Sequence, residues 1–144
     1  MNVVARIVAT PAMLTDIQSL LWSAILTFVM LCTASALRNR GWTAGGMQRA
    51  MGNREHVPEQ SPLAGRADRA AKNMLENMVL FTALVAAAHF AGRAGTRSDL
   101  GATIFFWARL AFFLVYLAGI VYLRTAVWII SIVGLAIIGS TVWS

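Results

Sequence analysis

The sequence predicts an all-α membrane protein, a bundle of four transmembrane helices in one integral membrane domain that covers residues 1–144. The first observation is composition: 58% of the residues are hydrophobic and only 12% are charged, with a mean hydropathy of +0.67. Soluble domains carry about 25% charged residues. The second observation is a set of four apolar segments, each long enough to cross a hydrocarbon core of about 30 Å. The third is that most basic residues gather around a single connector.

The first span is expected from residue 17 to residue 37, around the run LLWSAILTFVMLCTASAL. Thr15 is a suitable N-cap residue ahead of it. A signal peptide has a shorter apolar region and places its basic residues in front of that region. Here Arg38 and Arg40 follow the run. We therefore interpret it as a retained transmembrane helix.

The first connector, residues 39–65, is polar and is interrupted by glycine and proline. Seven of the twelve basic residues lie in or beside it. These are Arg38, Arg40, Arg49, Arg54, Arg66, Arg69 and Lys72. The positive-inside rule predicts that residues 38–68 form a cytoplasmic loop, with both termini on the opposite side. No RNA-binding aromatic motif or zinc-ligand spacing accompanies the net charge of +6, so no nucleic-acid partner is expected.

The second span, expected over residues 69–91, opens with an ordered set of polar residues. On a helix, Arg66, Arg69, Asn73 and Glu76 fall within about 80° of one another. Charges at the start of a helix are often simply solvated, and for Arg66 that interpretation stays open. Glu76 lies about two turns inside the apolar pattern. An acid at that depth has to face protein or a water-filled cavity.

The last stretch, from residue 100 to residue 144, contains only two charges, Arg109 and Arg124. A single helix of this length would measure about 67 Å, which is twice the thickness of the hydrocarbon core. The chain must therefore turn back, and Gly119 marks the natural place. The expected spans are residues 100–117 and 122–143.

The two arginines in these spans are expected to have polar or charged partners. Arg109 falls near the middle of the membrane, at a depth similar to that of Glu76, and each charge is costly alone in hydrocarbon. We therefore expect an ion pair between Glu76 and Arg109. Arg124 falls in the first turn of the fourth helix, where its charge adds to the positive end of the helix dipole and favours a bound anion. A lipid headgroup is the alternative partner for Arg124.

Together, the cytoplasmic half of the predicted bundle offers a set of side chains for a small ligand with several charges. The set is Arg38, Arg66, Arg69, Asn73, Glu76, Tyr116 and Arg124. Guanidinium forks bind carboxylates, and a carboxylate such as Glu76 can hold an amine. The sequence shows no Ser-His-Asp set, no pair of catalytic carboxylates and no His-rich cluster, so no metal site is predicted.

The motif Arg69-x-x-x-Asn73-x-x-Glu76 at the start of the second of four spans resembles the MAPEG family, the membrane-associated proteins in eicosanoid and glutathione metabolism. The run FFWARLAFFLVYLAGIVYLRTAVW across the last two spans is similar to the same family, and the likeness covers roughly residues 52–138. The resemblance implies a homotrimer of four-helix subunits with glutathione held between neighbouring subunits. It also implies roles for individual residues. Arg38, Arg69, Asn73, Glu76 and Tyr116 match glutathione-binding positions, and Arg124 matches the arginine that stabilises the glutathione thiolate.

Two positions depart from the pattern of the family. Asn77 stands where several eukaryotic members have tyrosine, and the spacing from Tyr116 to Arg124 varies among the branches. The turn sequence AGIVYLR is more similar to the bacterial branch. By resemblance, the protein is expected in a bacterial inner membrane.

The function implied by the resemblance is that of a membrane transferase or peroxidase with glutathione as cosubstrate. Its partners would be membrane lipids and a lipophilic electrophile or lipid hydroperoxide that enters sideways from the bilayer. Two alternatives remain. The same fold can serve as a non-catalytic lipid-binding or scaffold protein, or as an accessory subunit whose polar face serves assembly.

Overall fold

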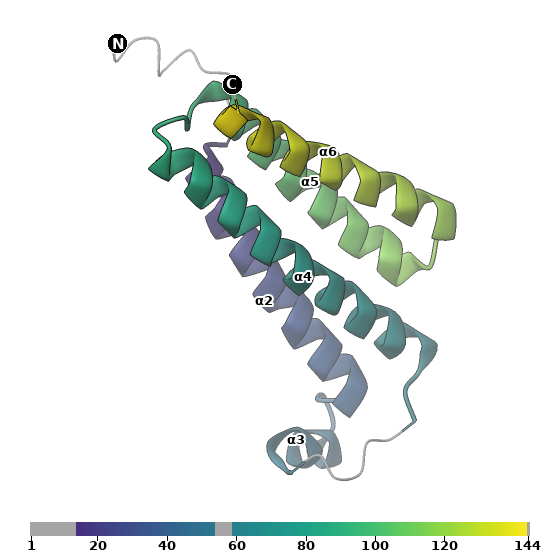
Figure 1. The fold of residues 1–144 in the computed structure, drawn as a ribbon. Helices are drawn as coiled ribbons and strands as arrows, with labels where there is room; N and C mark the ends of the chain where they lie inside the picture. Colours follow the sequence, from purple (N-terminus) through teal and green to yellow (C-terminus); the bar gives the residue numbers. More distant parts are fainter. Residues whose placement is uncertain (1–13, 54–58, 144) are drawn as a thin grey trace.

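The computed structural model describes residues 14–53 and 59–143. The described chain is helical and contains α2 (Asp16–Asn39), α3 (Ala44–Met51), α4 (Pro62–Phe90), α5 (Thr96–Ala118) and α6 (Val121–Trp143) (Figure 1). Four of these helices, all except α3, are long and apolar enough to cross a membrane. They lie where the four spans were expected.

The first helix has the start that the sequence predicts. Thr15 is the N-cap of α2, and its hydroxyl accepts a hydrogen bond from the backbone N–H of Gln18 at 3.2 Å. The Gln18 side chain in turn accepts one from the backbone N–H of Thr15 at 3.0 Å. This reciprocal capping box satisfies two N–H groups that the helix itself leaves unpaired.

The second long helix begins earlier than expected. α4 starts at Pro62, where Ser61 accepts a hydrogen bond from the N–H of Ala64 at 3.2 Å and proline occupies the first turn. Proline is favoured there because its missing N–H would be unpaired in any case. The charged run from residue 66 to residue 72 is therefore helical and continues without a break into the apolar span.

The short helix α3 was not predicted. Thr43 caps it by accepting a hydrogen bond from Gly46 N–H at 3.0 Å. Gly46 lies directly against the backbone carbonyl groups of Asn39 and Arg40, where a Cβ atom would overlap them. The glycines of this connector were interpreted as helix breakers, but Gly46 permits a close helix contact instead.

The last two helices form a tight antiparallel pair, the α5–α6 hairpin. Its turn falls at Gly119, as predicted, and this glycine has a φ of +80° that favours glycine over other residues. Gly101 and Gly134 face each other in the pair, and a Cβ added to either would lie 2.7 Å from the carbonyl oxygen of the other. Small residues of this kind allow membrane helices to approach closely.

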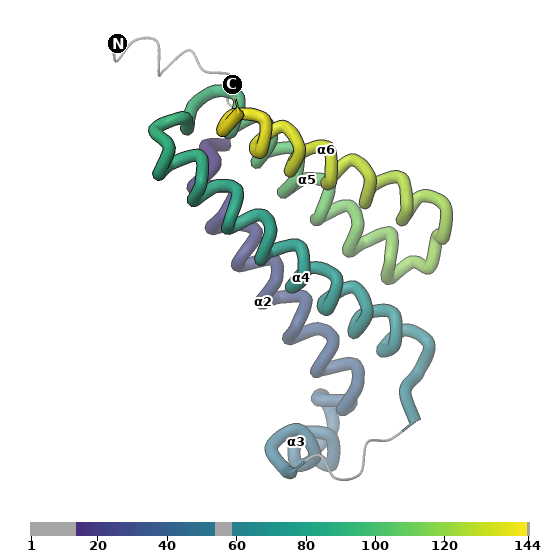
Figure 2. Tube along the Cα trace, viewed as in Figure 1, coloured from purple at the N-terminus to yellow at the C-terminus, as the bar shows by residue number. Residues whose placement is uncertain are grey.

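The long helices converge at one end and spread apart toward the other (Figures 1 and 2). The converging end, here called the Asp16 end, contains the start of α2 and the end of α6. The opposite end, here called the basic end, contains the end of α2, helix α3, the start of α4 and the α5–α6 turn. The start of α2 and the end of α6 lie at the same end because a chain that crosses four times returns to the side on which it began.

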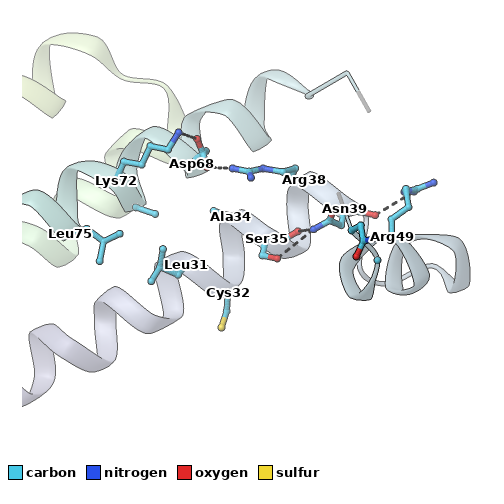
Figure 3. Close-up of a pocket in the computed structure, with 13 residues that line it drawn as sticks. Leu31, Cys32, Ala34, Ser35, Arg38, Asn39, Arg49, Asp68, Lys72 and Leu75 are labelled. Atoms are coloured by element: carbon cyan, nitrogen blue, oxygen red, sulfur yellow. Dashed lines mark hydrogen bonds and ion pairs between the residues drawn. The ribbon is translucent and has the colours of Figure 1, made fainter. Parts of the chain in front are cut away.

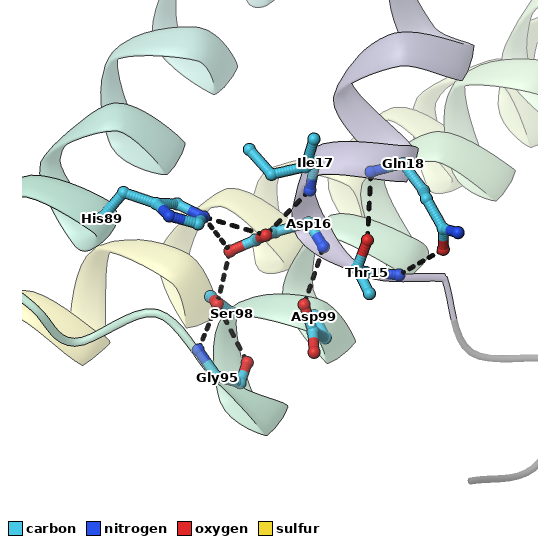
Figure 4. Close-up of polar contacts among 8 residues, drawn as sticks. All are labelled: Thr15, Asp16, Ile17, Gln18, His89, Gly95, Ser98 and Asp99. Atoms are coloured by element: carbon cyan, nitrogen blue, oxygen red, sulfur yellow. Dashed lines mark hydrogen bonds and ion pairs between the residues drawn. The ribbon is translucent and has the colours of Figure 1, made fainter. Parts of the chain in front are cut away.

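A buried carboxylate ties three helices together at the Asp16 end (Figure 4). The Asp16 side chain, which is almost fully buried, accepts a hydrogen bond from Ser98 Oγ at 2.7 Å and lies 3.0 and 3.1 Å from His89 Nε2. Its backbone N–H donates to Asp99 Oδ1 at 2.7 Å. This hub fixes the start of α2 to the end of α4 and the start of α5.

Candidate functional site

The clearest candidate site is a cavity of about 420 Å³ at the basic end, between the start of α4 and the α5–α6 turn. We call it the arginine cavity. Its lining residues are Gln60, Ser61, Pro62, Gly65, Arg66, Arg69, Tyr116, Gly119, Val121 and Arg124. Three of them are arginines, and none of the described lining residues is an acid. The cavity is therefore suited to an anion.

Helix α4 presents two of the three arginines. Arg66 and Arg69 are three residues apart and so share one face of the helix, as predicted. The guanidinium of Arg69 folds back over Gly65, where a Cβ atom would lie 3.3 Å from its Nη1. The absence of a side chain at Gly65 thus leaves space for the Arg69 head beside the start of the helix.

Helix α6 presents the third arginine. The backbone N–H of Arg124 donates to Ile120 O at 3.1 Å, which places the residue in the first turn of α6, as expected. Its guanidinium carbon lies 4.8 Å from the centre of the Tyr116 ring, within the range of a cation–π contact. The turn at Gly119 brings these two predicted site residues together.

Two helix starts add to the positive potential of the arginine cavity. Pro62 at the beginning of α4 and Val121 at the beginning of α6 both line it. The N-terminus of a helix carries the equivalent of about half a positive charge. Together with the three guanidinium groups, these two helix ends favour a carboxylate, a phosphate or a thiolate.

Arg38 lies in a different cavity, on another side of α4. This groove of about 640 Å³, here called the Arg38 groove, runs between α2, α3 and α4 (Figure 3). Arg38 pairs with Asp68, which also lies 2.8 Å from Lys72 Nζ. Leu31 and Leu75 line the part of the groove that leads into the apolar half of the bundle. Arg38 also lines a further cavity of about 540 Å³, which shares Gln60, Ser61 and Pro62 with the arginine cavity. Of the other predicted site residues, Asn73 and Glu76 line neither the arginine cavity nor the Arg38 groove.

Asn73 has a partner that the sequence did not predict. Arg109 is completely buried, and its Nη1 donates a hydrogen bond to Asn73 Oδ1 at 2.8 Å. The guanidinium also lies 5.4 and 5.3 Å from the ring centres of Phe105 and Phe112. Asn77, one turn beyond Asn73, donates to the Asn73 carbonyl oxygen at 2.8 Å.

The expected ion pair between Glu76 and Arg109 is not present among the ion pairs of residues 14–53 and 59–143. The physical reason is the rotation of α4, which turns Asn73 toward α5 and leaves Glu76 exposed on the surface of the subunit. Asn73 and Glu76 are close on the helix, yet only Asn73 contacts the buried arginine. Similar depth in the membrane, together with a shared helix face of about 80°, was too coarse a criterion to separate the two residues.

In the part of the chain that the structure describes, no three His, Cys, Asp or Glu side chains are grouped as they would be to hold a metal ion. The chemistry that this end of the bundle offers is electrostatic, through guanidinium groups, helix ends and the Tyr116 hydroxyl.

The comparisons with known proteins agree with the resemblance in the sequence. The MAPEG family model matches residues 19–142, which is most of the chain. No curated protein and no solved structure gives a significant match. The matched region contains α4 and α5, nearly all of α2 and α6, and every residue of the arginine cavity. This chain belongs to the MAPEG family, whose members are membrane proteins of eicosanoid and glutathione metabolism.

Proposed function

We propose that this protein is a glutathione-dependent membrane enzyme, a transferase or peroxidase that acts on lipophilic electrophiles or lipid hydroperoxides. The observation that carries the proposal is the arginine cavity. It is lined by Arg66, Arg69 and Arg124 and by the first residues of α4 and α6, and none of its described lining residues is an acid. Glutathione brings two carboxylates and a thiol to such a site. The family of the chain favours glutathione over other anions.

Arg124 is the residue we assign to the thiolate. A free thiol has a pKa of about 8.5, and cationic neighbours or a helix N-terminus lower it. Arg124 supplies the cation, and the start of α6, in whose first turn this residue lies, supplies the helix N-terminus. The contact with the Tyr116 ring holds that guanidinium at the edge of the cavity. Arg69 and Tyr116 then remain to orient the carboxylates and the peptide groups.

Either reaction balances with glutathione as the nucleophile or the reductant. In transfer, the thiolate sulfur forms a bond to an electrophilic carbon and a leaving group departs with its electron pair. In peroxide reduction, the thiolate attacks the outer peroxide oxygen, and the O–O bond breaks to give the sulfenic acid of glutathione and an alkoxide, which takes a proton from water to become the alcohol. A second glutathione converts that sulfenic acid into the disulfide and water. The guanidinium of Arg124 stabilises the anionic sulfur before attack.

We further infer that the complete site is formed between subunits of a homotrimer. Within one subunit, Arg38 lines the Arg38 groove and a further cavity that shares Gln60, Ser61 and Pro62 with the arginine cavity, but it does not line the arginine cavity itself. Glu76, the residue we assign to the ammonium group of glutathione, is exposed on the subunit surface. A neighbouring subunit that contributes Arg38 to the arginine cavity would unite the two halves. This arrangement explains why charged side chains occur on exposed faces of a membrane-spanning helix.

The hydrophobic substrate would arrive through the bilayer. Large apolar side chains are exposed along α6 beside the arginine cavity, among them Val121, Leu123 and Ile129. Exposed apolar surface of this extent is stable only in contact with lipid or another subunit. We place the protein in a bacterial inner membrane with its basic end in the cytoplasm, in accord with the positive-inside rule.

A second candidate function is a non-catalytic lipid-binding protein or scaffold. The Arg38 groove favours it, since this cavity combines apolar residues at one end with three basic side chains and one acid at the other, namely Arg38, Arg49, Lys72 and Asp68. That combination fits an anionic amphiphile. The deciding experiment is calorimetric titration of the purified protein with glutathione and S-hexyl glutathione, followed by turnover of a chloronitrobenzene and of a fatty-acid hydroperoxide. Binding without turnover would favour the scaffold, and no binding would refute the enzyme.

A further inference from the structure

Arg66 connects the start of α4 with the end of α5. Its Nε donates a hydrogen bond to the backbone carbonyl oxygen of Leu117 at 3.1 Å, across 51 residues of sequence. Leu117 lies in the last turn of α5, where carbonyl groups have no partner within the helix. The same guanidinium lies against Gly119, where a Cβ atom would be 3.6 Å from the Arg66 Cζ. Arg66 therefore contacts the α5–α6 turn through both polar and van der Waals interactions.

This turn determines where Arg124 lies. The N–H of Gly119 donates to Val115 O at 3.0 Å, and the chain then enters α6, in which Arg124 occupies the first turn. Arg124 is only five residues beyond Gly119 and is held there by regular helix geometry. A movement of the turn relative to α4 would therefore move Arg124 relative to Arg69.

The turn needs such a connection because the helices spread apart at the basic end (Figure 2). Another hydrogen bond between α4 and α5, from the Arg109 side chain to the Asn73 side chain, lies seven residues further along α4. That separation corresponds to about 10 Å along the helix axis. Arg66 thus binds the α5–α6 turn to α4 at the basic end, which the contact between Arg109 and Asn73 does not reach.

We propose that Arg66 is a positioning residue that holds the α5–α6 turn, and through it Arg124, against the start of α4. The consequence for catalysis rests on the function proposed above, whereas the consequence for the turn does not. The competing explanation is that Arg66 acts only through its charge, as one of the three guanidinium groups around the bound anion. The two explanations make different predictions for variants of the turn.

Hydrogen–deuterium exchange of the full-length protein in lipid nanodiscs tests the structural part without any ligand. Arg66→Met should speed exchange at the amides of Gly119 and Ile120 about tenfold, the effect of losing a hydrogen bond from a charged donor. Arg66→Lys keeps a donor and should fall between Arg66→Met and the wild type. Arg93→Met, which removes an exposed arginine from the opposite end, is the control and should leave these amides unchanged. Unchanged exchange in Arg66→Met would overturn the proposal.

Gly119→Ala distinguishes an effect of the position of the α5–α6 turn from an effect of the charge of Arg66. It keeps all three arginines but strains the turn, because alanine disfavours a φ of +80°. Arg66→Met and Gly119→Ala should each cut the absorbance of bound thiolate and kcat about tenfold, while the Kd for glutathione changes less than threefold. If exchange at the turn is faster in both variants but the thiolate absorbance is lost only in Arg66→Met, then Arg66 acts by its charge. That result would overturn the positioning role. Absence of glutathione binding in the wild type would refute the proposed function, and the exchange measurement would still decide the role of Arg66.

Discussion

Arg109 Nη1 donates a hydrogen bond to Asn73 Oδ1 at 2.8 Å, across the interface between α4 and α5. The guanidinium is fully buried, and its Nε and Nη2 have no hydrogen-bond partner in the described subunit. Asn73 thus supplies the polar contact to a cation deep in an apolar bundle, with the rings of Phe105 and Phe112 beside it. This contact links Asn73, a residue of the family motif, to α5, the helix that also contains Tyr116.

The first prediction concerns this contact. Asn73→Leu should lower the free energy of unfolding by about 1.5–3 kcal/mol, because it leaves a buried guanidinium without its acceptor. Arg109→Leu should also destabilise the protein, whereas the double variant should lose less than the sum of the two. Unfolding in mixed micelles measures all three. Glu76→Gln is the control, and we expect little change in stability from it because Glu76 is exposed in the subunit. Additive losses would show that Asn73 and Arg109 are not coupled.

The second prediction concerns Arg124. Arg124→Leu should leave most of the glutathione affinity in place, because other side chains still hold the carboxylates. It should remove the ultraviolet absorbance of the bound thiolate and slow conjugation about 30- to 1000-fold, the usual range of about 2–4 kcal/mol for one electrostatic group in a dry site. Arg124→Lys should recover only part of the rate, since an ammonium lacks the planar fork. If binding is lost and the wild type shows no thiolate signal, Arg124 only positions the ligand.

The third prediction tests whether sites are shared between subunits. Arg38→Met and Arg124→Leu should each be nearly inactive as homotrimers. Mixed trimers from co-expression of the two should show about a third of the wild-type activity, because in a closed three-membered ring each mixed trimer contains one site of three with both arginines intact. Differently tagged subunits, purified by both tags, allow the mixed trimers to be assayed alone. No recovery would place both arginines in the site of a single subunit, and a monodisperse monomer by light scattering would exclude the trimer.

The fourth prediction concerns the Asp16 hub. Asp16→Ala should lower the free energy of unfolding by about 1–3 kcal/mol, because the buried Ser98 hydroxyl loses its acceptor and the more exposed His89 loses its partner. The hub lies at the start of α2, at the end of the bundle opposite the α5–α6 turn and the arginine cavity (Figure 1), so the Kd for glutathione should change little in protein that remains folded. Circular dichroism during thermal unfolding and calorimetric titration give the two quantities. A large loss of affinity with unchanged stability would contradict a purely structural role.

Composition and spacing are sufficient to predict most of the fold. A chain with so few charges has to place its apolar segments in a membrane, and backbone groups in hydrocarbon have to be satisfied within helices. The cap at Thr15 and the turn at Gly119 follow from local chemistry that needs no tertiary contact. The grouping of Arg66 with Arg69 follows from the helical repeat alone.

Tertiary structure alone decided three matters. The rotation of α4 about its axis determines that Asn73 rather than Glu76 meets Arg109, and a periodicity cannot fix that angle to within one residue. The close contact of Gly46 with the end of α2 determines that part of the polar connector is helical. The crossing of the helices determines that Arg38 and Arg124 line separate cavities of one subunit. The physical reason is the same in each case: spacing along a helix defines which side chains share a face, and only packing against other helices defines what that face meets.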